Sequence, residues 1–441
     1  MREVETVIAG GTVLTSDEED AIIHDGSVAV NGNTIVAVGG AEEMAKRFSG
    51  RTTIDARQCL VMPGLVNGHT HAAMTCFRGL ADDRELMDWL NNYIFPAEAK
   101  NVDPELAYWG SVLACAEMIR SGTTTFCDMY LFEDETARAA GEAGMRCLVG
   151  EGIFDFPSPS TKTPEEGLAC TRMLIEKWAG HPLVSIAVEP HTLYTCSPEV
   201  IGKAKALADE YGVPFAIHLL ETRGEAAQLA ERFGMKATRF LERMGCLDER
   251  FIAFHCVAMD DEDMRIFADH GCAVVHNPES NMKLASGIAP VAAMLEQGIT
   301  VGLGTDGCAS NNDLDLFGAM SAAALLGKVE RLDPTALPAP TVVRMATRDG
   351  ARVLGMGDIT GSLREGMRAD VIIIDLDKPH LTPLYDEHSH IVYAMKGADV
   401  KTVLIDGRIV MEDRRLLTID EGHVMERVRG IARKISRSLK T

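Results

Sequence analysis

The stretch PGLVNGHTH, residues 63–71, joins a short apolar run to two histidines that stand two positions apart. Residues two apart on a β-strand point to the same side, so the imidazoles of His69 and His71 face one spot. Histidine is a common metal ligand, but such a pair alone is weak evidence for a metal site. A metal site would therefore need further metal-binding residues elsewhere in the chain that the fold brings close to this pair.

Apolar runs of this kind recur from about residue 60 to residue 365, and helical stretches separate them. Among these stretches, Pro198–Tyr211 and Arg223–Met244 have an amphipathic pattern. Eight repeats of a strand followed by a helix predict a (β/α)8 barrel, the TIM barrel of the α/β class. The predicted strands are Leu65–His71, Thr123–Asp128, Arg146–Gly152, Val184–His191, Phe215–Leu219, Phe251–Val257, Ala273–Asn277 and Thr300–Asp306.

The two ends of the chain share a different pattern, which is typical of β-hairpins. Gly26–Val30 and Thr34–Gly39 flank the turn sequence NGN, and Val400–Ile405 and Arg408–Met411 flank the dipeptide DG. Either set alone has few strands to pair, so we expect both ends to build one small composite β-sandwich domain. The predicted domains are residues 1–58 with 370–441 for the sandwich and 59–369 for the barrel. The stretch Gly422–Lys440 is helical in pattern.

Composition limits the range of partners. The 441 residues carry 43 basic and 65 acidic side chains, a net charge of −22, which would repel phosphate backbones and anionic lipid. We therefore expect no nucleic-acid or membrane partner and a small neutral or cationic substrate. The start of the chain, MREVE, lacks the order of a signal peptide, and the eleven cysteines include no C-x-x-C pair. These features predict a cytoplasmic protein with reduced cysteines, and we expect a homo-oligomer, either a dimer or a tetramer.

Further ligand-type residues fall at the ends of other predicted strands. His218 lies at the end of the fifth strand and Asp306 ends the eighth. The carboxyl ends of barrel strands form one rim, so both side chains are expected to meet His69 and His71 there. Three imidazoles and one carboxylate suit one Zn²⁺ ion with a position left for water, although Fe²⁺ or Mn²⁺ would also fit. Such a metal lowers the pKa of its water toward about 7 and so supplies hydroxide at neutral pH.

Two more residues at this rim have the chemistry of proton transfer and charge stabilisation. Glu221 follows His218 by three positions, in the sequence HLLE, and could shuttle a proton between the attacking water and the leaving group. Alternatively, Glu221 could be an acidic residue that stabilises the start of the next helix. His255 lies near the end of the sixth strand. Beside a metal it would stabilise a developing oxyanion, whereas alone it would more often be a core histidine.

These motifs resemble those of a known family, the amidohydrolase superfamily. PGLVNGHTH is similar to its first-strand motif, Gly304–Gly307 (GTDG) to its last-strand motif, and Ala369–Ile372 (ADVI) to the return into its composite β-sandwich. Within the superfamily, Asn277–Gly287 (NPESNMKLASG) resembles the seventh-strand segment of 5-methylthioadenosine/S-adenosylhomocysteine deaminases and of their triazine-hydrolase relatives. The resemblance covers essentially the whole chain.

The resemblance implies a role for each rim residue. The implied ligands of one zinc ion are His69, His71, His218 and Asp306. Asp306 would also take the proton of the metal-bound water, Glu221 would protonate the purine N1 and then the departing amine, and His255 would stabilise the tetrahedral intermediate. The end of the fourth strand reads AVEPH and has no lysine. The two-metal members of the superfamily use a carboxylated lysine there, so a single metal is implied.

The resemblance also implies the substrate. Glu98 matches the family position that binds ribose hydroxyls, and His191 matches the position that bonds the purine ring. Trp89 could line the pocket for the 5′ substituent, or it could be an ordinary core residue. Residues 154–162, after the third strand, contain no arginine to bind the carboxylate of S-adenosylhomocysteine, and Lys162 could replace one only as a point charge. This favours 5′-methylthioadenosine, 5′-deoxyadenosine or adenosine as the substrate.

The predicted function is therefore hydrolytic deamination of an adenine nucleoside at C6, which gives the inosine analogue and ammonia. One alternative is another single-metal amidohydrolase, such as an s-triazine chlorohydrolase or an enzyme like guanine or cytosine deaminase. Glu98 and His191 favour the nucleoside. A second alternative is a barrel without catalysis that acts as a binding protein, and the complete set of ligand-type residues argues against it. The sequence leaves the 5′ substituent, the native metal and the oligomeric state open.

Overall fold

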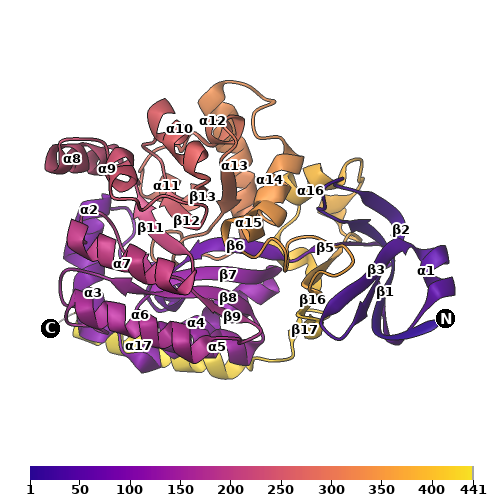
Figure 1. Cartoon of the computed structure of the whole chain (residues 1–441). Coiled ribbons are helices and arrows are strands. Elements are labelled where there is room, and N and C mark those ends of the chain that lie inside the picture. Colours follow the sequence, from indigo (N-terminus) through magenta and orange to yellow (C-terminus); the bar gives the residue numbers. More distant parts are fainter. Residues whose placement is uncertain (440–441) are drawn as a thin grey trace.

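The computed structural model describes residues 1–439 and consists of a barrel with a β-sandwich at one side (Figure 1). Lys440 and Thr441 lie outside the described residues; the predicted segment 370–441 and the predicted helix Gly422–Lys440 both extend into this part. Within residues 1–439, no helix is long and apolar enough to cross a membrane.

All eight predicted barrel strands are present, and the (β/α)8 barrel is confirmed. They are β6 (Leu65–Thr70), β7 (Thr123–Tyr130), β8 (Arg146–Ile153), β9 (Val184–Ile186) with β10 (Glu189–Pro190), β11 (Phe215–Leu219), β12 (Phe251–His255), β13 (Ala273–His276) and β14 (Thr300–Leu303). Parallel pairing gives the orders β6-β7-β8-β10, with β9 on β8, and β11-β12-β13-β14. Bridges from Val188 to Phe215 and from Thr192 to His218 join the two halves. The Asp306 N–H donates to the His69 carbonyl at 2.9 Å, which links the last strand to the first.

Helices surround the barrel, as the amphipathic stretches predict. They are η1 (Ala72–Phe77), α2 (Leu86–Trp89), η2 (Leu90–Ile94), α3 (Phe95–Asn101), α4 (Pro104–Arg120), α5 (Glu133–Ala143), α6 (Pro164–Trp178), α7 (Pro198–Tyr211), α8 (Arg223–Phe233), α9 (Ala237–Arg243), α10 (Asp261–His270), α11 (Pro278–Lys283), α12 (Val291–Glu296), α13 (Leu316–Arg331), α14 (Ala339–Met345) and α15 (Arg348–Val353). The prediction of one helix over Arg223–Met244 is wrong. Gly234, with φ of 66°, ends α8 in the left-handed conformation, and a second helix starts three residues later.

Both ends of the chain form one hydrogen-bonded sheet, so the composite β-sandwich is confirmed. Its strands are β1 (Arg2–Leu14), β2 (Ile22–Asn31), β3 (Thr34–Gly40), β4 (Phe48–Asp55), β5 (Cys59–Pro63), β15 (Val371–Asp375), β16 (Val400–Ile405), β17 (Arg408–Glu412) and β18 (Arg415–Leu416), with α1 (Ala41–Arg47) between β3 and β4. The order is β18-β17-β16-β15-β5-β1-β2-β3, and β4 pairs with β1. β5 pairs with both β1 and β15, so this sheet extends past residue 58. The division at 58/59 and 369/370 itself stays a proposal.

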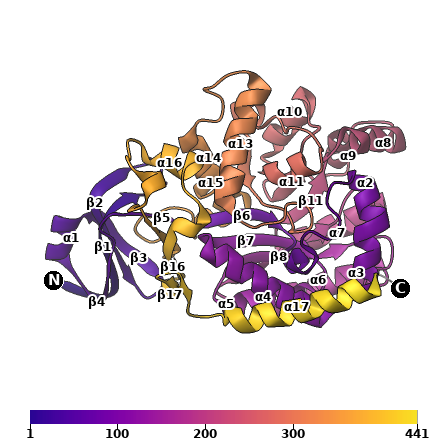
Figure 2. The same ribbon diagram turned by 180° about the vertical axis from the view of Figure 1, so that it is seen from behind.

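The last elements of the chain pack on the barrel. They are η3 (Pro379–Leu381), α16 (Glu387–Tyr393), η4 (Gly397–Asp399) and α17 (Glu421–Ser438). α17 lies along α4 and α3 (Figure 2). It buries Val424, Val428, Ile431 and Ile435 in a cluster that also contains residues of α3 and α4. The C-terminal helix therefore supports the helices beside one part of the rim.

A buried ion pair ties the barrel to the terminal sheet. Arg146 begins β8, and its guanidinium makes a two-pronged contact with the Asp370 carboxylate at 2.9 and 3.2 Å. Asp370 also accepts the backbone N–H of Asp406 at 2.6 Å. Since Arg146 stands at the amino end of its strand, it lies at the barrel end opposite the rim.

Candidate active site

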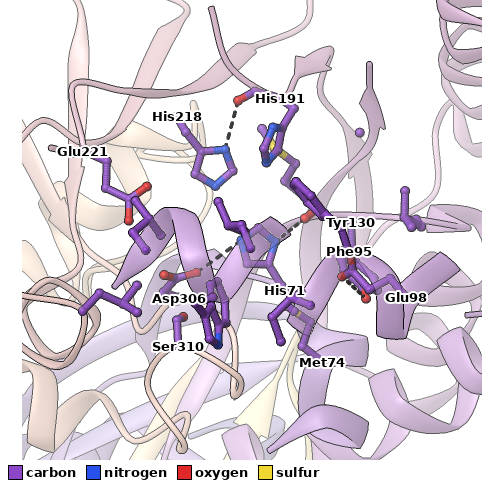
Figure 3. A pocket seen from close by; sticks show the side chains of 18 of the residues that line it. His71, Met74, Phe95, Glu98, Tyr130, His191, His218, Glu221, Asp306 and Ser310 are labelled. Carbon is purple, nitrogen blue, oxygen red and sulfur yellow. Dashed lines mark hydrogen bonds and ion pairs between the residues drawn. The ribbon is translucent and has the colours of Figure 1, made fainter. Parts of the chain in front are cut away.

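The carboxyl ends of the barrel strands enclose a cavity of about 720 Å³, including its open mouth (Figure 3). Every site residue predicted from the sequence lies in or against it. The cavity is lined by His71, Trp89, Glu98, His191, His218, Glu221, His255 and Asp306 among others. His69 is fully buried, and its ring contacts those of His71, His218 and His255.

The predicted metal ligands lie in two groups that share His69, namely His69 with His71 and Asp306, and His69 with His218 and His255, and within each group the ligand atoms lie within 4.8 Å of one another. The Asp306 Oδ1 atom lies 3.2 Å from His71 Nε2 and 3.5 Å from His69 Nε2. Four ligand atoms around one zinc ion lie roughly 3.4 Å apart when they form a tetrahedron. Both ring nitrogens of His69 are buried and have no hydrogen-bond partner among residues 1–439, which is costly unless a cation occupies the centre. These residues fit one divalent metal ion.

Hydrogen bonds to backbone carbonyls orient two of the imidazoles. His71 Nδ1 bonds the carbonyl of Met129 at the end of β7, and His218 Nδ1 bonds the carbonyl of His191 at 3.0 Å. Each ring therefore turns its Nε2 atom toward the centre. Outer contacts of this kind fix the tautomer of metal-binding histidines.

The charges in this cluster favour a cation. Burial lowers the pKa of His69 to about 3 and that of His218 well below its usual value, so both rings are neutral, as metal ligands must be. Burial also lowers the pKa of His71, but the hydrogen bond and charge of Asp306 outweigh it and raise the pKa to about 9. For Asp306, burial raises the pKa, but the nearby rings of His69 and His71 outweigh this effect and bring the pKa well below its usual value. The negative Asp306 thus attracts positive charge to this point.

The backbone is strained where these residues leave their strands. Leu220, His255, Cys256 and Asp306 have φ of 54°, 72°, 50° and 63°, in the left-handed region that favours glycine. His255 is the last residue of β12, and Asp306 lies three residues beyond β14. Such conformations each cost of order 1–3 kcal/mol and persist where the surrounding structure enforces them.

Glu221 stands in the short loop between β11 and α8, with its side chain nine-tenths buried. Thr222, not Glu221, caps α8, since its hydroxyl accepts the Glu225 N–H at 3.0 Å. The Glu225 carboxylate accepts the N–H groups of Leu220 at 3.2 Å and of Glu221 at 2.7 Å, which fixes the loop. Burial raises the pKa of Glu221, so this carboxyl group can carry a proton nearer neutral pH. The positioning contact from Glu225 was not predicted from the sequence.

Two neighbours on α11 hold the other reacting groups. Ser280 Oγ donates to Asp306 Oδ2 at 2.6 Å, and His255 Nδ1 bonds Asn281 Oδ1 at 2.9 Å. The Nε2 atom of His255 lies 4.0 Å from Asp306 Oδ2. Neither Ser280 nor Asn281 was predicted as a site residue, although both lie in the motif 277–287.

Another part of the cavity offers a hydrogen-bond acceptor. Glu98 on α3 is 8% exposed, and the Tyr130 hydroxyl donates to its Oε1 atom at 2.6 Å. Burial raises the pKa of Glu98 to about 7, against the lowering effect of the Tyr130 hydrogen bond. Tyr130 was missed too. Its position at the end of the second barrel strand is the signal that could have identified it.

Aromatic and aliphatic side chains form the remaining wall. The apolar lining includes Leu86, Trp89, Leu90, Ile94, Phe95 and Phe154. His191 lies against Phe154 with ring centroids 4.8 Å apart, and burial lowers the pKa of His191 to about 3. Within residues 1–439, no lysine or arginine lines the cavity. Lys162 bonds the carbonyl of Ser158 instead, and Arg172 pairs with Glu210 on the outside of the barrel.

Comparisons with known proteins agree with this geometry. Residues 60–410 match the amidohydrolase family. Over 440 residues, 100% of this chain and 99% of the relative, the chain is 63% identical to 5-methylthioadenosine/S-adenosylhomocysteine deaminase 1 of Syntrophus aciditrophicus. It is 45% identical over 431 residues, 97% of this chain and 98% of the relative, to a 5′-deoxyadenosine deaminase of Methanosarcina mazei. The crystal structure of an adenosine deaminase from Xanthomonas campestris with bound zinc superposes with a TM-score of 0.97 over 99% of both chains, at 37% identity.

Proposed function

Because the chain belongs to the amidohydrolase family, we propose that it hydrolytically removes the C6 amino group of an adenine nucleoside. One observation carries this proposal. A single cavity holds a metal-type cluster of histidines and Asp306, a buried Glu221 beside it, and an acceptor, Glu98, at the other side (Figure 3). A nucleoside has its reacting purine carbon at one end and its ribose hydroxyls at the other, so it needs these groups in one cavity.

We propose one divalent metal ion, with zinc as the best candidate, held by His69, His71, His218 and Asp306. Three imidazoles and one carboxylate are a common donor set for zinc, and the relative from Xanthomonas contains zinc. When bound, the ion supplies a nucleophile at neutral pH, because it lowers the pKa of water.

The side chains around this centre move the protons. Asp306, whose Oδ2 atom receives the Ser280 hydroxyl, accepts a proton from the attacking water. Glu221 donates a proton to the purine N1, and C6 then becomes tetrahedral. His255 stabilises the oxygen added at C6. Glu221 then takes the proton that the C6 hydroxyl group loses and passes it to the C6 amino group. The C–N bond breaks as the C6 oxygen becomes a carbonyl, ammonia leaves, and the proton held by Asp306 returns to Glu221.

The rest of the cavity selects the nucleoside. We assign Glu98 to the ribose hydroxyls and His191 to the purine ring. The wall that contains Trp89 would cover the 5′ substituent. Since this wall is apolar and no lysine or arginine among residues 1–439 lines the cavity, it favours a small apolar substituent, such as the 5′-methylthio or 5′-deoxy group, over a charged amino acid. Both 5′-methylthioadenosine and 5′-deoxyadenosine figure in the names of the relatives.

Loss of adenine absorbance during incubation tests the proposal. Adenosine, 5′-methylthioadenosine, 5′-deoxyadenosine and S-adenosylhomocysteine would be compared, with kcat/KM as the measure. We expect turnover of the first three and at least a tenfold lower kcat/KM for the last. Turnover of a chlorotriazine without turnover of any nucleoside would instead support the triazine alternative. The homo-oligomeric state and the cytoplasmic location remain predictions from the sequence.

A further inference from the structure

Tyr130 lies at the carboxyl end of β7. This strand end contacts both Glu98 and His71, which stand on different sides of the cavity. Tyr130 is the last residue of β7 and is 7% exposed, and its hydroxyl donates to Glu98 Oε1 at 2.6 Å. The preceding residue, Met129, offers its carbonyl to His71 Nδ1. Two consecutive residues of β7 therefore orient a predicted metal ligand and the acceptor at the other side of the cavity (Figure 3).

The bond from Tyr130 restricts what Glu98 can do. Within residues 1–439, no other side chain donates a hydrogen bond to this carboxylate. The phenol uses one lone pair of Oε1, and the remaining lone pairs of the carboxylate are left for a ligand. The Tyr130 ring is itself held in the apolar cluster that contains Trp89 and Leu131, so its hydroxyl has a defined position. A carboxylate held in this way is prepared for two hydroxyl donors at a fixed place.

We propose that Tyr130 is a positioning residue that holds Glu98 as the acceptor for the ribose hydroxyls, and that it thereby sets the preference for ribonucleosides over 2′-deoxyribonucleosides. This inference rests on the proposed function, in which Glu98 binds those hydroxyls. It adds a residue that acts through Glu98 and has no part in the chemistry at C6.

The physical reason lies in the ionisation and rotation of a buried carboxyl group. Burial favours the neutral form of Glu98, and the phenol favours the carboxylate. Removing the phenol leaves a carboxyl group that is more often neutral and free to turn. It then loses a charge-assisted hydrogen bond to the ribose, which corresponds to about a tenfold weaker binding.

The variant Tyr130→Phe removes the hydroxyl and keeps the ring. KM and kcat would be measured for the wild type and this variant with a ribonucleoside and its 2′-deoxy counterpart. We expect KM for the ribonucleoside to rise about tenfold, with kcat within about twofold. KM for the 2′-deoxy substrate should change less than about threefold. This substrate has no 2′-hydroxyl group, so it already lacks one of the two hydrogen bonds to Glu98. Added to Glu98→Gln, the change Tyr130→Phe should have little further effect, since both act on one contact.

The chain offers a matched control. The Tyr108 hydroxyl donates to Glu142 Oε2, also at 2.6 Å, on the exposed outside of α4 and α5. Tyr108→Phe removes the same kind of bond away from the cavity and should leave all four constants unchanged.

Two results would overturn the inference alone. Equal rises of KM for both nucleosides would make Tyr130 a purely structural residue, and a loss of kcat at constant KM would place its effect at C6. If Tyr130→Phe does not fold, 3-fluorotyrosine can replace Tyr130, because it keeps the hydrogen bond to Glu98 but has a more acidic phenol. Equal changes of KM for both nucleosides would again contradict the inference. Absence of turnover by the wild type with both nucleosides would overturn the proposed function and this inference together.

Discussion

The amide oxygen of Asn281 lies 2.9 Å from His255 Nδ1, although the two residues stand on different elements. Asn281 belongs to α11, and His255 ends β12 in a left-handed conformation. This bond occupies the Nδ1 side of the ring, so Nε2 faces the cavity toward Asp306. The preceding residue, Ser280, holds Asp306 in turn. A single turn of helix thus orients two of the groups assigned to the reaction.

Asn281→Ala should therefore lower kcat by about 10- to 100-fold with little change in KM, because His255 loses the bond that sets its tautomer. Steady-state kinetics with the best nucleoside would check this. Asn92→Ala is the control, since the exposed Asn92 bonds Asp88 and neither residue lines the cavity. A rise in KM at constant kcat would show that Asn281 contributes to binding instead.

Removal of the metal should abolish turnover, and added zinc should restore it. His69→Ala should purify with little bound metal, because it removes one of four ligands at the centre. Metal analysis by mass spectrometry and the recovery of activity provide the measurement. His270→Ala is the matched control, as His270 lies at the surface near Glu242. Full activity of a chelator-treated sample without metal would contradict the proposed site.

Glu221→Gln should lower kcat by about 10²- to 10⁴-fold, because an amide cannot donate and accept the transferred proton. Substrate binding should persist, and isothermal titration with the inactive variant would measure it. Glu231→Gln changes an exposed glutamate on α8, the helix that follows Glu221, and should have no effect. An active Glu221→Gln variant would remove Glu221 from the proton pathway.

The ribose contact should depend on pH through Glu98, whose pKa is raised to about 7. Below this pH the group is neutral, and above it the carboxylate accepts the ribose hydroxyls. KM should therefore fall as the pH rises from 6 to 8, by about tenfold, as the ionised fraction rises from roughly 0.1 to 0.9. Glu98→Gln should remove this dependence. A KM of the wild type that rises with pH would contradict the assignment of the Glu98 carboxylate to the ribose hydroxyls.

The buried pair Arg146–Asp370 should matter for stability and not for turnover. Arg146→Met leaves the Asp370 carboxylate buried without its partner, which costs about 3–5 kcal/mol in the free energy of unfolding. Denaturant unfolding would measure the loss, and kcat of the folded enzyme should remain near that of the wild type. Arg172→Met removes an exposed pair with Glu210 and should leave the unfolding midpoint nearly unchanged. An equal loss in the free energy of unfolding for both variants would show that burial of the Arg146–Asp370 pair does not increase its contribution to stability.

The strands, and the meeting of His69, His71, His218 and Asp306 at one rim, could be predicted because local patterns encode them. An apolar run followed by a histidine or aspartate marks a barrel strand and its functional end, as at His218 and Asp306. The positioning residues could not be predicted in this way. Tyr130 acts on Glu98 and Asn281 acts on His255 across gaps of 32 and 26 residues, and only the folded barrel brings these side chains together. The end of a strand at Tyr130 and the motif around Asn281 place both residues near the rim, but neither pattern indicates which side chain each of them holds.

The ends and packing partners of helices also could not be predicted from local sequence patterns. The amphipathic pattern continues across Gly234, and only the left-handed backbone there divides α8 from α9. The pattern of α17 indicated a helix but not its partner. Its place along α4 and α3 depends on contacts between residues at opposite ends of the chain.

The pairing of β5 with β15 sets an order for biosynthesis. A ribosome delivers β1 to β5 first and β15 only after the whole barrel, yet β5 requires β15 as its neighbour. α3, which carries Glu98, receives the support of α17 later still. During synthesis the sheet therefore stays incomplete until β15 has been made, and α3 lacks its packing partner until α17 has followed.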